Sequence, residues 1–270
     1  MYKIIASDMD ETFLNHQHKL VEANISTLKT LKDKGIFFVP SSGRPYWSIM
    51  QSLQPIEALL EGSYILSFNG GSINKVGQDQ PLVSHTLPFE QVNTIFNLGK
   101  RLGVGMHVYE LQGPIWGCDF TQDEIDYLAG HIPYNYFEDD NIEFLRNKPI
   151  AKILFVKSDI TYLENLKADL EAELDFCDLT ISANRYLEMN PKGVNKGAGL
   201  KELASILDID IAHTIAVGDS LNDLEMIEDA GVGVAVANAH PLIKDCADFI
   251  AESSCDDGVL AEIYSKIVSH

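Results

Sequence analysis

Short apolar runs alternate with amphipathic stretches in the first part of the chain. The runs lack polar alternation, which is typical of strands buried on both faces of a sheet; they cover residues 3–7, 36–40 and 64–68. Between the first two runs, Leu28 and Leu31 lie on one side of a helical pattern over residues 22–34, which Gly35 ends. A second helix is expected from Pro45, because proline favours the first helical position.

The end of the chain repeats this alternation. Apolar strand patterns cover residues 213–218, 232–236 and 247–251. Helical patterns cover residues 221–229, residues 241–245 and the C-terminal tail. Strands that alternate with helices imply right-handed crossovers, so the sequence predicts an α/β fold with a doubly wound, mostly parallel, Rossmann-like sheet.

The middle of the chain has a different pattern. Residues 105–111 and 151–157 alternate more clearly between polar and apolar positions, and Tyr and Phe are frequent. We therefore expect an inserted α+β domain over residues 82–190. Residues 1–81 and 191–270 would together form the core domain.

Composition and charge narrow the possible functions. The chain has 270 residues, 46 % of them hydrophobic and 22 % charged, as in ordinary globular proteins. Its four cysteines are far apart and form no CxxC or Cys/His motif, so neither a zinc site nor a disulfide framework is expected. Without a signal-peptide pattern or a long apolar run, we expect a cytoplasmic protein with reduced thiols. The net charge of −20 argues against nucleic acids and anionic membranes as partners.

Two groups of polar residues follow the first two predicted strands. Open parallel sheets bind their ligands at this edge. Asp8 and Asp10 are two residues apart, so their side chains can converge on one ligand. Ser42, Gly43 and Arg44 offer a hydroxyl, a glycine amide and a helix N-terminus, which are the parts of an anion site.

Two more groups lie in the C-terminal part of the core. The stretch KGVNKG offers Lys192 and Lys196, and GDSLND places Asp219, Asn222 and Asp223 on a strand-to-helix turn. Each group alone also has a structural interpretation: a polar loop, a frequent turn, a solvated lysine or a helix cap. That interpretation is weaker for four groups that each lie at the end of a separate predicted element.

Together the four groups resemble the motifs of the haloacid dehalogenase superfamily. The pattern DxDxT, a hydroxyl residue followed by Gly-Arg, a later lysine and GDxxND occur in this order. The chain looks most like the Cof-type phosphatases, a sugar-phosphatase-like branch with a large α/β cap between the second and third motifs. The resemblance covers essentially the whole chain, including residues 193–204 (GVNKGAGLKELA) and 230–239 (AGVGVAVANA).

The resemblance implies a role for each motif residue. Asp8 would be the nucleophile that becomes an aspartyl-phosphate, and Asp10 the general acid and then the base. Mg²⁺ would be held by Asp8, the Asp10 carbonyl and Asp219. The phosphoryl group would be bound by Ser42, the Gly43 amide, Lys196, and the Met9 and Asp10 amides.

The remaining motif residues would support these groups. Asn222 would reach the phosphate or orient Lys196. Asp223 would act through a metal-bound water or a hydrogen bond outside the first coordination sphere, and Thr12 would support the loop. Arg44 would pair with the substrate or form an ion pair beneath the site.

Charge counting agrees with a bound metal. If ionised, Asp8, Asp10, Asp219 and Asp223 supply four negative charges, against three positive charges from Mg²⁺ and Lys196. A hard cation with oxygen ligands suits Mg²⁺ and neutralises a transferring phosphoryl group. The crowding also suggests that Asp10 is protonated when the substrate binds, as a general acid must be.

Other residues near the motifs have more than one interpretation. Glu11 replaces the glycine usual in this motif, and we expect its side chain to point outward. His16 and His18 resemble an HxH metal pair, but without a further ligand nearby in the sequence a solvated loop is favoured. Two aromatic residues of the inserted domain, Tyr109 and Trp116, fit its core better than a stacking role, and so does Tyr134.

The sequence thus predicts a Mg²⁺-dependent phosphatase acting on small phosphorylated metabolites, with sugar phosphates as the expected class. Two alternatives stay open. A phosphomutase would share the chemistry but re-bind its intermediate, and it usually needs more basic residues in the cap. A non-enzymatic phosphate-binding protein would not need the intact set of nucleophile, acid, lysine and metal aspartate.

Overall fold

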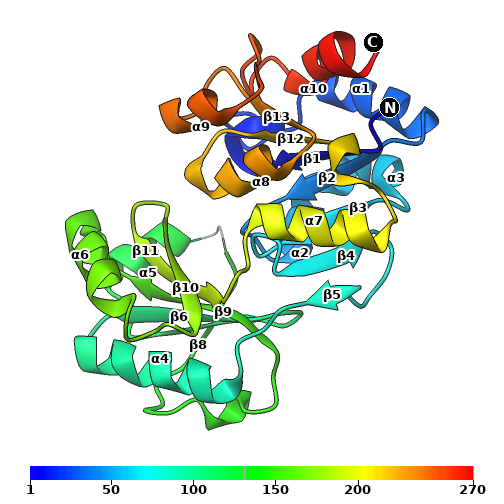
Figure 1. The fold of residues 1–270 in the computed structure, drawn as a ribbon. Helices are drawn as coiled ribbons and strands as arrows, with labels where there is room; N and C mark the ends of the chain where they lie inside the picture. Colours follow the sequence, from blue (N-terminus) through cyan, green and yellow to red (C-terminus); the bar gives the residue numbers. More distant parts are fainter. Residues whose placement is uncertain (130–131, 270) are drawn as a thin grey trace. The chain divides into compact units, whose positions relative to one another are not determined.

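The computed structural model describes residues 1–129 and 132–269. The chain forms two compact units: Met1–Ser84 together with Asn195–His270, and His85–Val194. Figure 1 follows the chain through both by colour. The chain passes between them at residues 84/85 and 194/195, whereas the sequence pattern places the domain boundaries at 81/82 and 190/191.

The first unit is built on a mostly parallel sheet. Within the described residues it has eight strands in the order β14-β13-β12-β1-β2-β3-β4-β5. Six are mutually parallel: β1 (Ile4–Asp8), β2 (Phe37–Ser41), β3 (Tyr64–Ser67), β12 (Thr214–Gly218), β13 (Val232–Ala235) and β14 (Phe249–Ile250). β4 (Ser72–Lys75) pairs antiparallel with β3, and the edge strand β5 (Val83–Ser84) pairs antiparallel with β4.

Helices cover both faces of this sheet. On one side α1 (Glu22–Asp33) packs against β2 and against α10 (Val259–Ile263), so segments far apart in the sequence lie side by side (Figure 1). On the other side α7 (Lys196–Ile206) packs on β3 and β4, and α8 (Leu224–Asp229) packs on β12 and β13 (Figure 1). Central strand residues such as Ile4 and Ile215 are fully buried between these layers. The predicted α/β fold class is therefore confirmed.

Shorter elements complete the first unit. They are η1 (Met9–Phe13), α2 (Tyr46–Leu53), η2 (Gln54–Ile56), α3 (Glu57–Leu60), η4 (Ile211–His213), η5 (Leu221–Asp223), α9 (Pro241–Cys246) and η6 (Tyr264–Val268). Two details differ from the sequence prediction. Pro45 precedes the first residue of α2, with extended backbone angles. The helix predicted over residues 221–229 is divided into η5 and α8, because the Asp223 side chain accepts the Ser220 amide and starts a tighter first turn.

The second unit has a sheet of its own. In the described residues its strand order is β10-β11-β9-β6-β7-β8, and all pairs are antiparallel except β7 with β8. The strands are β6 (Gly105–Glu110), β7 (Ile115–Cys118), β8 (Asn135–Tyr136), β9 (Ile150–Val156), β10 (Cys177–Ser182) and β11 (Tyr186–Pro191). The helices are α4 (Phe89–Leu102), α5 (Gln122–Leu128), η3 (Glu143–Leu145) and α6 (Ile160–Leu170).

The alternation seen in the sequence separates two faces of this second sheet. Apolar residues such as Met106 and Phe155 join the core that α4 and α6 cover. The alternate positions carry polar groups that are nevertheless buried and paired, such as Lys152 with Glu188 and His107 with Glu124. Tyr109 is buried as well, and Trp116 packs against the apolar core. Tyr134 lies against Phe120.

No helix in residues 1–129 and 132–269 combines the length and the apolar character needed to cross a bilayer.

Candidate active site

Asp8 is the last residue of the central strand β1, and its carboxylate is the expected nucleophile. It is buried, and its Oδ1 accepts a hydrogen bond from Nζ of Lys196. Burial raises the pKa of the Asp8 carboxyl well above its usual range, and Asp223 and Asp219 raise it further against the charge of Lys196. A divalent cation beside these carboxylates would oppose that rise.

Lys196 is held in place by the start of α7. Asn195 caps this helix, because its Oδ1 accepts the Ala198 amide at 2.7 Å. The Lys196 side chain is fully buried, and its Nζ donates to Asp223 Oδ1 at 2.6 Å as well as to Asp8. Burial opposes the lysine charge, but the two carboxylates outweigh it and raise the pKa of Lys196 above its ordinary value. Lys196 is thus a fixed cation between Asp8 and Asp223.

Asp219, which follows β12, is oriented by two hydroxyl groups. Thr12 Oγ1 donates to Asp219 Oδ1 at 2.7 Å, and Ser220 Oγ donates to Oδ2 at 2.8 Å. Asp223 Oδ2 accepts the amides of Asp219 and Ser220, each at 3.0 Å, which fixes the turn. A Cβ on Gly218 would lie only 2.5 Å from the Asp223 side chain, so the close approach requires glycine.

The three buried aspartates form one oxygen cluster. One carboxylate oxygen each from Asp8, Asp219 and Asp223 lies within 4.8 Å of the others. Oxygen donors of this kind suit Mg²⁺ rather than a soft metal. The set could therefore hold a hard divalent cation.

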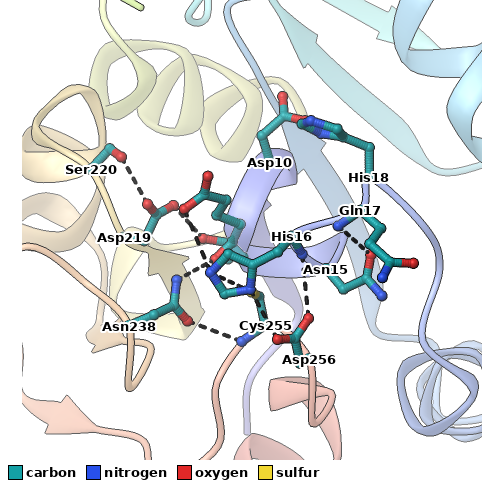
Figure 2. A network of polar contacts seen from close by, with 12 residues as sticks. Asp10, Asn15, His16, Gln17, His18, Asp219, Ser220, Asn238, Cys255 and Asp256 are labelled. Atoms are coloured by element: carbon teal, nitrogen blue, oxygen red, sulfur yellow. Dashed lines mark hydrogen bonds and ion pairs between the residues drawn. The ribbon is translucent and has the colours of Figure 1, made fainter.

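Asp10 points to a different pair of partners. The short turn η1 leaves helical geometry at Asp10 and Glu11, and Glu11 has a left-handed φ of 57°. Asp10 Oδ1 accepts from Nη2 of Arg44. The same oxygen lies 2.9 Å from Nδ1 of His18, which Figure 2 shows beside Asp10. Arg44 also donates to Ser52 Oγ at 3.2 Å. Arg44 thus forms an ion pair with Asp10, and its pairing with a substrate stays a prediction.

His18 was not recognised from the sequence as a partner of Asp10. A chain reversal brings it back, because Asn15 Oδ1 accepts the amides of Gln17 and Lys19. Asparagine in a polar stretch is a signal for such a turn. The signal predicts the reversal but not which residue the imidazole then meets.

The Ser-Gly-Arg group lies just after β2. The Ser42 amide donates to the Leu66 carbonyl at 2.9 Å, and its hydroxyl accepts the Arg44 amide at 3.2 Å. A Cβ on Gly43 would lie 3.2 Å from the Asn69 side chain, so this turn is closely packed. The Ser42 side chain is buried and held in one place.

Three residues named from the sequence have other neighbours. Asn222 Nδ2 donates to Asn69 Oδ1 at 3.3 Å, and the contacts that hold Lys196 come from Asp8 and Asp223 instead. Lys192 pairs with Asp178 of the second unit at 2.8 Å. The Met9 side chain is buried in the apolar core, so only its backbone can serve the site.

Comparisons with known proteins agree with this geometry. The family model for haloacid dehalogenase-like hydrolase matches residues 5–263. A 5-amino-6-(5-phospho-D-ribitylamino)uracil phosphatase of Bacillus subtilis (strain 168) is 28 % identical and covers 97 % of this chain and 94 % of its own. An HMP-PP phosphatase of Yersinia pestis (strain Pestoides F) is 31 % identical, over 90 % of this chain and 87 % of its own.

A solved structure extends the likeness to three dimensions. A haloacid dehalogenase-like hydrolase from Bacteroides thetaiotaomicron superimposes with a TM-score of 0.83 at 28 % identity. The match covers 98 % of this chain and 99 % of that one. The chain belongs to the haloacid dehalogenase-like hydrolases of the Cof type, and it is a phosphoric monoester hydrolase.

Proposed function

We propose that this enzyme hydrolyses small phosphomonoesters with Mg²⁺, through an aspartyl-phosphate on Asp8. One observation carries the proposal: the buried Asp8 carboxylate contacts Lys196 and belongs to an oxygen cluster with Asp219 and Asp223. A carboxylate in this position can attack phosphorus only if positive charge offsets the repulsion between the two anions.

In the first step an Asp8 oxygen attacks phosphorus. The bond from aspartate oxygen to phosphorus forms as the bond from phosphorus to the ester oxygen breaks. The departing alcohol takes a proton from the Asp10 carboxyl group. In the second step water attacks phosphorus, Asp10 takes back a proton, and Asp8 leaves as a carboxylate with inorganic phosphate as the product.

Arg44 and His18 orient Asp10 for this work. Both approach the same oxygen, Oδ1. We therefore assign proton transfer to the other carboxylate oxygen, Oδ2. Because the Asp10 side chain is held at Oδ1, its Oδ2 keeps a constant position. This favours proton transfer from Oδ2 to a bound substrate.

Asp8, Asp219 and the Asp10 carbonyl would hold Mg²⁺. The metal supplies neutralising charge for the phosphoryl oxygens during in-line transfer. The Asp223 carboxylate is already engaged by Lys196 and by the amides of Asp219 and Ser220, so it would position these groups rather than bind the metal.

The phosphoryl group would be bound by fixed donors of the first unit. Support comes from the buried Ser42 hydroxyl, the tight Gly43 turn and the charge of Lys196. The amides of Met9 and Asp10 follow the nucleophile and would complete the cradle. Asn222, which is hydrogen-bonded to Asn69, would also bind the phosphoryl group.

Small phosphorylated metabolites are the proposed substrates, with sugar phosphates as the expected class. Support comes from the relatives, whose names give a phosphoribitylamino-uracil and HMP-PP as substrates. The net charge of −20 disfavours nucleic acid as a partner. Cytoplasmic location is part of the same proposal.

Phosphate release from p-nitrophenyl phosphate tests the assignment. We expect Asp8→Asn to lower kcat at least about a thousandfold, because an amide is a poor nucleophile. Chelation should abolish wild-type release, and added Mg²⁺ should restore it. Asp33→Asn, an exposed change of the same type at the end of α1, should leave both rates unchanged. Release by Asp8→Asn at the wild-type rate would contradict the proposal.

A further inference from the structure

A second group of metal-ligating side chains lies beside the catalytic loop. His16, Cys255 and Asp256 each place one ligand atom within 4.8 Å of the other two. Figure 2 shows the thiol of Cys255 and the carboxylate of Asp256 on the same side of the His16 ring, where both contact Nδ1. The group joins residues about 240 positions apart in the sequence, which is why no Cys/His motif is visible there.

We propose that His16 Nδ1, Cys255 Sγ and Asp256 Oδ2 form a zinc site, with a water molecule as the fourth ligand. One nitrogen, one sulfur and one oxygen are ligands that Zn²⁺ accepts together, whereas Mg²⁺ does not favour a thiolate. As the zinc–sulfur bond forms, the thiol proton is released to solvent. This site is separate from the Asp8 cluster and does not depend on the proposed phosphatase mechanism.

The distances are close to those of a tetrahedral site. His16 Nδ1 lies 3.2 Å from Cys255 Sγ and 3.0 Å from Asp256 Oδ2. Bond lengths of about 2.1 Å to nitrogen and oxygen and about 2.3 Å to sulfur place tetrahedral ligands roughly 3.4–3.6 Å apart. Each of these two pairs would thus have to separate by only about 0.4 Å, and Sγ and Oδ2 already lie within 4.8 Å of each other.

Hydrogen bonds already hold the ligands in place. Asp256 Oδ1 accepts the His16 amide at 3.3 Å, which leaves Oδ2 on the side of the ring. Asn238 Oδ1 accepts the Cys255 amide at 3.0 Å, and its Nδ2 donates to the Glu11 carbonyl at 2.8 Å. The two loops that carry the ligands are therefore connected through Asn238.

Glu11 has a role in this arrangement. Its Oε2 lies 3.9 Å from Nε2 of His16, the ring nitrogen farther from Cys255 Sγ, at an ion-pair distance. A histidine on a metal commonly directs its second nitrogen to a carboxylate, which fixes the tautomer and strengthens the ligand. Glu11 is a positioning residue for His16, which accounts for the glutamate that replaces the usual glycine.

The alternative use of this group, thiol catalysis, has less support. Cys255 is fully buried, and burial raises the pKa of its thiol to about 11, so a metal-free thiol stays protonated. Both the thiol and the carboxylate contact the same ring nitrogen. A catalytic triad would use one nitrogen for each.

Cobalt titration of the metal-free full-length enzyme tests the zinc site, with Mg²⁺ in excess to occupy the Asp8 cluster. Co²⁺ bound to a thiolate absorbs in the near ultraviolet, and oxygen ligands alone do not give this band. We expect one equivalent of Co²⁺ to produce the band, and Zn²⁺ but not Mg²⁺ to remove it. Absence of the band in the wild-type enzyme would overturn the proposal.

Variants assign the ligands. Cys255→Ser should lose the band, whereas Cys246→Ser, a half-buried thiol bonded to the Ile243 carbonyl, should keep it. His16→Gln removes a half-exposed ring and should weaken Co²⁺ binding at least tenfold without unfolding the chain. Glu11→Gln should weaken it about tenfold. A band that survives in Cys255→Ser, or unchanged affinity in His16→Gln, would contradict the assignment.

Discussion

At the residue scale, Lys196 organises the catalytic centre. Its buried Nζ holds Asp8, the proposed nucleophile, on one side and Asp223 on the other. Asp223 in turn fixes the turn that carries Asp219. A single buried cation thus connects residues from β1, α7 and the turn after β12, and its removal or exposure would disturb all three.

Loss of the Asp223 charge should therefore destabilise the fold. We expect Asp223→Asn to lower the free energy of unfolding by about 3 kcal/mol in urea, because one partner of a buried ion pair is removed. The matched control is Asp229→Asn, which breaks the pair of the exposed Lys201 with the half-buried Asp229 and should cost less than about 1 kcal/mol. Equal effects of the two changes would argue against a buried structural role.

Residue-scale contacts were the least predictable from the sequence. The motifs identify Asp8, Lys196, Asp219 and Asp223, and the structure brings these four together. The approach of His18 to Asp10 and of His16 to Cys255 depends on the path of loops. Hydrophobic periodicity carries no information on such loops, so neither contact could be predicted.

At the scale of elements, apolar runs predicted the central strands well. β1, β2 and β3 are buried on both faces, so their sequences are continuously apolar. The short strands β4 and β5 at one end of the sheet, which pair antiparallel with each other, were missed, because their pairing depends on the neighbouring strand more than on local sequence. β14 is only two residues long, where the pattern predicted five.

The second sheet makes a pH-dependent contribution to stability. His107 on β6 is buried against Glu124 of α5, at 2.8 Å between Nε2 and Oε1. Burial lowers the pKa of His107, although Glu124 opposes this. The unfolded chain therefore binds a proton that the folded chain does not, and this residue destabilises the fold as the pH falls below the ordinary histidine range.

His107→Gln should remove that contribution. We expect the free energy of unfolding of the wild type to fall more steeply between pH 7.5 and pH 5.5 than that of the variant, in urea titrations of the full chain. His85→Gln, at an exposed histidine, is the matched control and should keep the wild-type slope. Parallel slopes for the wild type and His107→Gln would show that His107 does not titrate with folding.

At the scale of the whole molecule, topology brings the site together. β12, β1 and β2 are adjacent parallel strands, so Asp8 at the end of β1, Ser42 after β2 and Asp219 after β12 lie at the same edge of the sheet. The alternation of strands and helices was enough to predict this edge. Figure 1 shows the three strands in the centre of the first unit.

The net charge of −20 makes the local charges at this edge important. A phosphate dianion approaches a strongly acidic molecule, and at physiological ionic strength only charges within about 8 Å act strongly on it. Lys196 provides positive charge there, and a metal bound to the Asp8 cluster would add to it. Binding of a phosphate dianion therefore depends on the local arrangement of charges at the site rather than on the net charge of the molecule.

The central claim is that Asp8 carries the phosphoryl group during turnover. The most direct measurement uses Asp10→Asn with p-nitrophenyl phosphate. Its leaving group departs without a general acid, whereas hydrolysis of the intermediate needs Asp10 as a base. We predict a burst of p-nitrophenolate equivalent to one enzyme site, and after acid quenching a phosphoryl group on the peptide that contains Asp8. A phosphoryl group on another residue, or turnover without a burst and without a labelled peptide, would contradict the account.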